Sequence, residues 1–131
     1  MRFDPSPGHN DARLAASLAR LDSGSGFAVI NLYDGVAPSP GGSPASSLLL
    51  VEIVLPKPSG EIVSNALSLF VSPLAIIINS GVARWARWLD GNSQWFGDSD
   101  VTDSAGNGFI RIPDTSLYAG GKTQVLGGTI V

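Results

Sequence analysis

The sequence predicts an all-β protein, an antiparallel β-sandwich or jelly roll with one short N-terminal helix. Short runs rich in Val, Ile, Leu and aromatic residues recur along the chain, and clusters of Gly, Pro, Asn, Asp and Ser divide them. The 16 glycines and 9 prolines fit a chain with many turns. At 131 residues and 44% hydrophobic content, the chain suits one domain that buries its own core. A closed β-barrel is the second possibility.

The N-terminal region divides into an arm and a helix. Residues 1–10, MRFDPSPGHN, are mostly polar and contain two prolines, so we expect an extended arm. Residues 11–131 form the predicted single domain, which begins with a helix over 11–21. Asn10 or Asp11 is the expected N-cap. Leucines then recur at spacings of four and three, which places them on one helix face: Leu14, Leu18 and Leu21.

The rest of the domain is predicted to contain roughly seven or eight strands. Their segments share a high content of β-branched, aliphatic and aromatic residues: 26–35, 47–56, 61–72, 74–79, 81–90, 93–98, 108–113 and 122–131. The longest linker, DGVAPSPGGSPASS (34–47), is too rich in Pro, Gly and Ser to form a regular element. Long irregular loops in compact domains are usually functional or mobile, so we expect one of these two roles for it.

All three tryptophans lie in the segment ARWARWLDGNSQWFGDSD (83–100), together with two arginines. Alternation along a strand places Trp85 and Arg87 on one face, and Arg84 and Trp88 on the other. Neither face is purely polar. This pattern is typical of a two-sided hairpin in which one of these two tryptophans is in the core and the other is half covered.

The dipeptide Asp90-Gly91, followed by Asn92, predicts a hairpin turn because Gly and Asn tolerate a positive φ. Trp95 and Phe96 would then return on the partner strand. Since Trp and Arg often anchor protein interfaces, the hairpin is the candidate binding surface. The candidate interface residues are Arg84, Trp85, Arg87, Trp88 and Trp95. A platform that stacks sugars or bases is the alternative.

The segment DSDVTDSAGNG (98–108) contains three closely spaced aspartates, as calcium loops do. It lacks the EF-hand spacing and the bidentate glutamate that completes such a loop. We therefore interpret it as an Asx-rich turn and expect no metal and no cofactor, with a calcium site as the alternative.

The sequence shows no catalytic motif, and we expect no enzyme. The chain has no cysteine, which excludes thiol chemistry and disulfides. Its one histidine, His9, lies in the polar arm, where it has no fixed position beside a nucleophile. Glu52 and Glu61 are the acids that a glycosidase pair would need, but Glu52 is expected on the solvent face of its strand. The Gly-Gly pairs near the C-terminus lack the Lys-Ser/Thr of a phosphate loop.

Charge and hydropathy restrict the partners. The net charge of −3 argues against nucleic acid, because its binders usually present a basic surface. The most apolar stretch, residues 66–79, is interrupted by Ser72 and Pro73 and is shorter than the roughly 20 apolar residues that span a bilayer. The arm has no apolar signal-peptide core. We expect a soluble protein that neither enters a membrane nor follows the secretory route.

The order of local motifs resembles that of small proteins encoded among the structural genes of tailed bacteriophages. Those proteins share a helix, a strand ending in Tyr-x-Gly, a Pro-rich loop, a Leu-Leu strand, a Gly-x-Ala-x-Trp-x-Arg strand and an Ala-Gly-Gly turn. Trp88 and the acidic segment 98–108 depart from this pattern. The matching motifs span nearly the whole chain: LDSGSG (21–26), INLYDG (30–35) with Pro38 after it, SLLLVEIVL (47–55), GVARWARWLDG (81–91) and YAGGKTQV (118–125).

This resemblance implies a structural virion component of the head or its attachments, without catalytic residues. We expect a decoration, or cement, protein that binds the major capsid protein on the capsid surface. It would be made in the host cytoplasm and form a small homo-oligomer. A tail, neck or fibre component is the second possibility, and a carbohydrate-binding module is the third. An arm and a loop that order on contact would let such a protein bridge capsid subunits.

Overall fold

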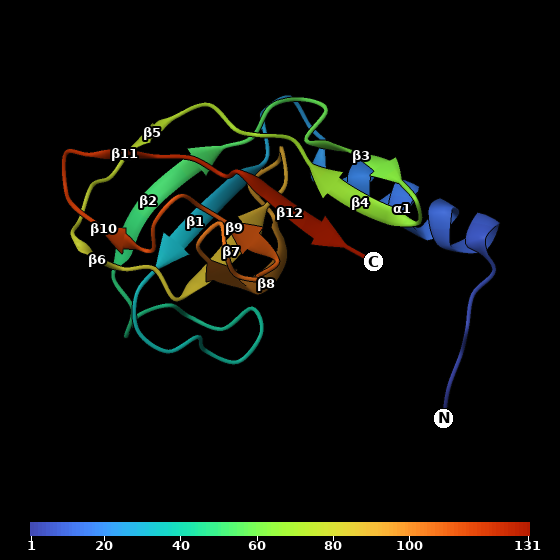
Figure 1. The fold of residues 1–131 in the computed structure, drawn as a ribbon, viewed down its shortest axis with the longest axis horizontal. Coiled ribbons are helices and arrows are strands. Elements are labelled where there is room, and N and C mark those ends of the chain that lie inside the picture. The colour runs from blue at the N-terminus through green and yellow to red at the C-terminus, as the bar shows by residue number, and fades with distance from the viewer.

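The structure, a computed structural model of residues 1–131, shows a mainly β-protein with one helix near its N-terminus (Figure 1). The helix, α1, spans Pro7–Leu21. The strands are β1 (Val29–Tyr33), β2 (Leu49–Val54), β3 (Gly60–Val63), β4 (Ala66–Leu69), β5 (Ala75–Ile76), β6 (Gly81–Val82), β7 (Trp85–Leu89), β8 (Trp95–Thr102), β9 (Ile110–Arg111), β10 (Ser116–Leu117), β11 (Lys122–Thr123) and β12 (Gly127–Ile130).

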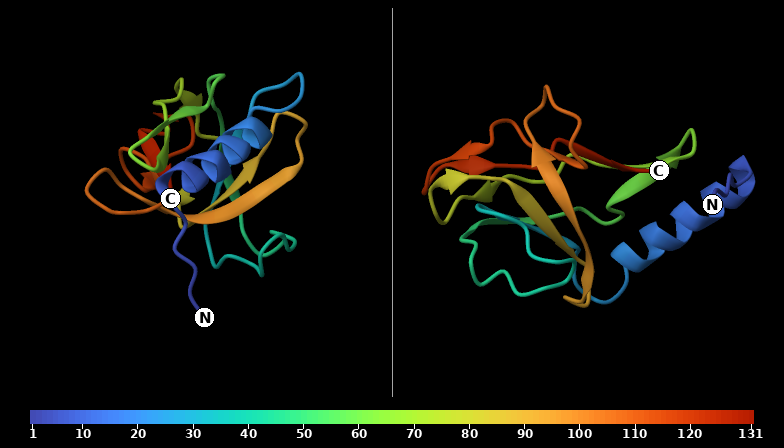
Figure 2. Two further views of the ribbon diagram at one scale, coloured as in Figure 1. Left: turned by 90° about the vertical axis from the view of Figure 1, so that its right-hand side faces the viewer. Right: turned by 90° about the horizontal axis from the view of Figure 1, so that it is seen from below.

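Eight strands form one sheet in the order β2-β1-β7-β8-β9-β12-β4-β3. Neighbouring strands are antiparallel except β8 and β9, which are parallel. The sheet curls into a half-barrel, and two short ribbons, β10–β6 and β11–β5, lie at the end opposite α1 (Figure 1; Figure 2). The all-β class with a short N-terminal helix is therefore confirmed. The two facing sheets of an antiparallel sandwich or jelly roll are not confirmed.

Helix α1 begins before its predicted start because Ser6, rather than Asn10 or Asp11, caps it. The Ser6 side chain accepts a hydrogen bond from the His9 N–H at 3.2 Å. Pro7 suits the first helical position because it has no N–H to satisfy. The extended arm is therefore Met1–Ser6, shorter than predicted.

Helix α1 lies against the β3–β4 hairpin. Leu14 and Leu21 are the buried residues of the helix, which packs against β3 and β4. Just after the helix, the Asp22 carboxylate accepts hydrogen bonds from the Ser59 N–H at 3.0 Å and from the Ser59 hydroxyl at 2.5 Å. These contacts fix the helix at one end of the sheet (Figure 1).

The predicted strand 61–72 is a hairpin instead of one strand. β3 and β4 pair antiparallel, and the turn residues Ser64 and Asn65 have φ angles of 51° and 61°. Two consecutive residues with positive φ indicate a type I′ turn, whose twist matches that of the flanking strands. Each of the other predicted segments contains at least part of an observed strand, and only β10 lies outside all of them.

One hydrophobic core joins the helix to most of the strands. It includes Leu21 at the end of α1, Ile30 and Leu32 in β1, Trp88 in β7 and Val125 before β12. Because these residues come from nearly the full length of the chain, the helix and the C-terminal strands depend on the same packing.

The tip of the β7–β8 hairpin is organised by Asp90. Its carboxylate accepts hydrogen bonds from the N–H groups of Asn92 (2.8 Å) and Gln94 (3.0 Å). The residue with positive φ is Ser93, at 60°, rather than Gly91 or Asn92. The predicted turn therefore exists at the predicted place, but as a longer loop whose left-handed residue is near its end.

This tip packs against the segment that follows α1. Arg20 Nε donates to Asp90 Oδ2 at 3.0 Å, and the Gly26 N–H donates to the Gly91 carbonyl at 3.1 Å. The backbone oxygens of Ser23 and Gly26 lie directly where a Cβ on Gly91 would stand. Gly91 is thus needed for close approach of two backbones.

We expect Gly91→Ala to lower the free energy of unfolding by about 1–3 kcal/mol, because the added methyl collides with backbone oxygens that cannot easily move. Gly97→Ala is the matched control, since nothing lies within 4 Å of a Cβ at that position. It should leave stability unchanged or slightly higher. Chemical denaturation of the two variants measures the difference, and equal stabilities would contradict the close packing at Gly91.

Candidate functional site

The structure does not bring the five candidate interface residues onto one exposed surface. Trp85 and Trp88 are both only 2% exposed, so neither ring is half covered as predicted. Arg87 is largely buried, whereas Arg84 is exposed and Trp95 is 46% exposed. The two buried tryptophans therefore serve packing, and they lie on opposite faces of the sheet.

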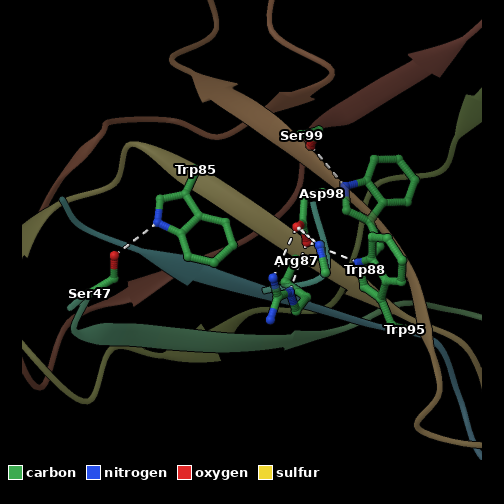
Figure 3. Close-up of polar contacts among 8 residues, drawn as sticks. Ser47, Trp85, Arg87, Trp88, Trp95, Asp98 and Ser99 are labelled. Atoms are coloured by element: carbon green, nitrogen blue, oxygen red, sulfur yellow. Dashed lines mark hydrogen bonds and ion pairs between the residues drawn. The ribbon is translucent and has the colours of Figure 1, made fainter. Parts of the chain in front are cut away.

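Trp85 anchors both ends of the Pro-rich loop 34–47. Its ring stacks on Tyr33 with centroids 4.5 Å apart and planes 13° apart. Its indole N–H lies 3.2 Å from the Asp34 carbonyl and 3.2 Å from the Ser47 hydroxyl, and Figure 3 shows the contact with Ser47. Since Asp34 and Ser47 are the first and last residues of the loop, one side chain closes the loop at its base.

Trp88 points to the core side of the same strand. Its indole N–H donates to the Ser99 hydroxyl at 2.8 Å (Figure 3), and its ring stacks on Phe96 with centroids 5.8 Å apart. The polar group of a buried tryptophan needs such a partner. Ser99 on β8 therefore lets β7 bury this ring without an unpaired donor.

An ion pair joins β7 to β8 on the face away from Trp88. Arg87 and Asp98 are cross-strand partners, with Nε to Oδ1 at 2.8 Å and Nη2 to Oδ2 at 3.0 Å. Their side chains are 12% and 13% exposed. The guanidinium also lies over the Trp85 ring, 5.2 Å from its centroid. A two-bond pair of this kind fixes orientation as well as charge.

Asp98 also holds the tip of the Pro-rich loop. Its carboxylate accepts hydrogen bonds from the Trp95 indole at 3.1 Å and from the Gly41 N–H at 3.0 Å. Gly41 has a φ of +75°, and a Cβ there would lie 3.0 Å from the Trp95 ring. The loop is therefore fixed at its tip as well as at its base, so one side of the exposed tryptophan is covered.

These contacts set the ionisation of the pair. Burial opposes ionisation of Asp98, but hydrogen bonds from Arg87, Gly41 and Trp95 outweigh it and hold the pKa of that carboxyl below its ordinary value. The hydrogen bond to Asp98 raises the pKa of Arg87 above its ordinary value. Both groups therefore stay charged throughout the physiological range.

Gly41 and Asp98 are members of this site that no sequence pattern indicates. They are 57 residues apart, and no local pattern connects a glycine in a Pro-rich linker with an aspartate on a strand. The register of the hairpin, which would pair Arg87 with Asp98, depends on a bulge between Trp88 and Leu89. A bulge of this kind has no clear sequence signal at these positions.

The three aspartates of the segment 98–108 act separately. Asp98 and Asp100 lie within β8, which extends further than predicted, so they are not part of a loop. Asp100 accepts the Phe109 N–H at 2.8 Å, and Asp103 accepts the Ala105 N–H at 3.0 Å in an Asx turn. No three Asp, Glu or His side chains gather closely enough to hold a metal ion.

Comparisons with protein-family models, with curated proteins and with solved structures gave no match. The helix is too short and too polar to cross a membrane. The fold and the hairpin contacts define a mainly β-protein in which most of the predicted interface residues hold the protein itself together.

We expect Asp98→Asn to lower the free energy of unfolding at neutral pH by about 1–3 kcal/mol, because Arg87 loses its charged partner in a mostly buried position. The folded-state pKa of Asp98 is depressed, so the stabilisation is present above its unfolded pKa of about 3.9 and is lost as the pH falls through the folded value. The variant should therefore lose less stability on acidification.

Urea denaturation at several pH values between neutral and acidic measures this dependence. The control is Asp4→Asn, which removes an ion pair whose side chains are 85% and 70% exposed and should change little. Parallel stability profiles for wild type and Asp98→Asn would show that the buried pair contributes nothing to acid sensitivity.

We expect Gly41→Ala to loosen the Pro-rich loop, because the methyl would collide with Trp95 in addition to the backbone strain at positive φ. Gly120→Ala isolates the strain alone, since Gly120 has a φ of +89° and open space around it. Limited proteolysis should cut residues 34–47 faster in Gly41→Ala than in the wild type or Gly120→Ala. Equal cleavage in all three would mean that the contact with Trp95 does not order the loop.

Proposed function

We propose that this chain is a capsid decoration (cement) protein of a tailed bacteriophage, which stabilises the head by bridging major capsid subunits. The observation that supports this function is the extended segment Met1–Ser6, which leaves α1 and points away from the β-body (Figure 1). Phe3 in this segment is 72% exposed, and Met1 is fully exposed. Exposed apolar side chains on an extended segment favour ordering on a partner, and Pro5 lowers the entropy that this ordering costs.

In this role the protein would occupy the outer capsid surface, as a homo-oligomer made in the host cytoplasm. A folded β-body and a projecting segment can contact different neighbours on a lattice. Linked contacts gain from effective concentration, so the assembled shell would bind the protein more tightly than a free capsid subunit does.

The alternatives receive less support from the hairpin. A carbohydrate-binding module needs exposed aromatic faces, but Trp85 and Trp88 are buried and Gly41 covers one side of Trp95. A tail, neck or fibre component could use the same projecting segment. Mass spectrometry of purified virions distinguishes a decoration protein from a tail, neck or fibre component, because a decoration protein should approach the copy number of the major capsid subunit.

We expect deletion of residues 1–5 to weaken binding to the capsid shell at least about tenfold, because one of two linked contacts is lost. Ser6 stays in this variant so that α1 keeps its N-cap. The measurement strips the protein from phage particles, adds back wild type or variant, and records both bound protein and heat-induced DNA release.

The matched control is Tyr118→Asp, which removes an exposed ring at the opposite end of the body, 71% exposed, and should bind normally. Circular dichroism checks that both variants stay folded. If wild type does not bind the shell, and stripped particles are as stable as complete ones, the decoration function is wrong.

A further inference from the structure

Strand β8 has an unpaired edge near the middle of the sheet. It pairs with β7 along Trp95–Asp100, but with β9 only at Val101 and Thr102. The other edge of Trp95–Asp100 therefore has no neighbouring strand. Such an edge presents backbone N–H and C=O groups that can pair with an extended segment from another chain.

Two hollows lie along this edge and share Phe96. The first, of about 160 Å³, is mostly apolar and is lined by Trp88, Phe96, Phe109 and Ile130 together with residues 97–99 of β8. The second, of about 380 Å³, lies between β8 and α1 and is lined by Ala16, Ser17, Arg20, Trp95 and Phe96. We call these two hollows, which meet at Phe96 beside the unpaired edge, the groove.

The extended segment Met1–Ser6 has the properties that this groove requires. Its length equals that of the unpaired edge, residues 95–100. As a strand, it would place Met1, Phe3 and Pro5 on one face and the polar residues on the other. The lack of an N–H on Pro5 is tolerated in an edge strand.

Charge also favours this segment. Asp98 is neutralised by Arg87, but Asp100 forms no ion pair and is exposed on the same strand. Arg2 is paired only with Asp4, and both side chains are largely exposed, so this pair is easily exchanged. A segment lying antiparallel along β8 would bring Arg2 to Asp100, and it would bring Asp4 to Asp98, whose charge Arg87 already balances.

The segment does not reach the groove of its own chain in the structure. Ser6 is held extended as the helix N-cap, and residues 1–6 lie at the far end of α1, away from β8 (Figure 1; Figure 2). Phe3 contacts His9 edge to face and is otherwise exposed. A second copy can offer its groove to this segment without any change in the helix start.

We propose that Met1–Ser6 of one copy adds as a strand to the free edge of β8 in a second copy, with Phe3 in the hollow between Phe96 and Phe109. The buried ring and the new backbone hydrogen bonds stabilise the contact, and Arg2 compensates the charge of Asp100. The role of this contact on the shell rests on the proposed function, because there a second copy would be the neighbour that the projecting segment binds.

Sedimentation velocity of the purified protein at increasing concentration tests the proposal. Wild type should self-associate, whereas deletion of residues 1–5, Phe3→Asp and Phe109→Asp should each weaken association at least about tenfold. Tyr118→Asp is the control and should associate as the wild type does. An equimolar mixture of Phe3→Asp and Phe109→Asp should associate again, because the first keeps an intact groove and the second an intact segment.

A peptide of residues 1–7 gives an independent measurement that does not need a folded Phe109→Asp. It should bind the deletion variant and shift the NMR amide signals of residues 96–99, and the same peptide with Phe3→Asp should not. Monomeric wild type without peptide binding, or undiminished association after the deletion, overturns the proposal.

The two proposals fail separately. If self-association and peptide binding are absent but shell binding still requires Phe3, the segment binds a capsid subunit and only this inference is wrong. If self-association follows the predictions but the protein does not bind the shell, the strand exchange is supported and the decoration function is wrong.

Discussion

The ion pair between Arg87 and Asp98 connects parts of the molecule that are far apart in the sequence. It joins the neighbouring strands β7 and β8, packs the guanidinium on Trp85, and leaves the Asp98 carboxylate free to accept hydrogen bonds from Trp95 and Gly41. Both charged side chains are mostly removed from water, so loss of one partner leaves the other charge poorly solvated. The hairpin, the loop and the exposed tryptophan therefore depend on a single pair.

The order of the Pro-rich loop explains why the hairpin tryptophans are less accessible than their sequence context suggests. A 34–47 segment rich in Pro, Gly and Ser would be expected to stay open, but three attachments oppose its entropy: Asp34 and Ser47 at Trp85, and Gly41 at Asp98. The loop thus contacts β7 through Trp85 and β8 through Asp98. Its attachment covers the stacked rings of Tyr33 and Trp85. The Trp85 side of the hairpin, which the sequence predicts as an interface, is therefore an internal contact.

Sequence patterns predicted the class of the fold, the helix, the hairpin and the position of nearly every strand, because alternation and turn residues are local signals. They did not predict the curl of the sheet, the parallel pair of β8 and β9, or the burial of both Trp85 and Trp88, since these depend on long-range contacts. Two local signals were available and missed: Ser6-Pro7 as a helix start, and Ser64-Asn65 as a hairpin turn within an apolar run. The partnership of Gly41 with Asp98 had no such signal.

An unpaired edge in the middle of a sheet is a hazard unless its chemistry limits what can pair with it. β8 places Asp98 and Asp100 along this edge, and charged side chains are a common protection against indiscriminate strand pairing. Because Arg87 neutralises Asp98, the remaining charge belongs to Asp100, at the end of the edge nearest β9. Asp100 would repel acidic strands and favour a segment that has a cation close to an aromatic ring, an order that Arg2-Phe3 supplies. The same carboxylate can therefore protect the edge from unrelated chains and select the segment that the apolar hollow accepts.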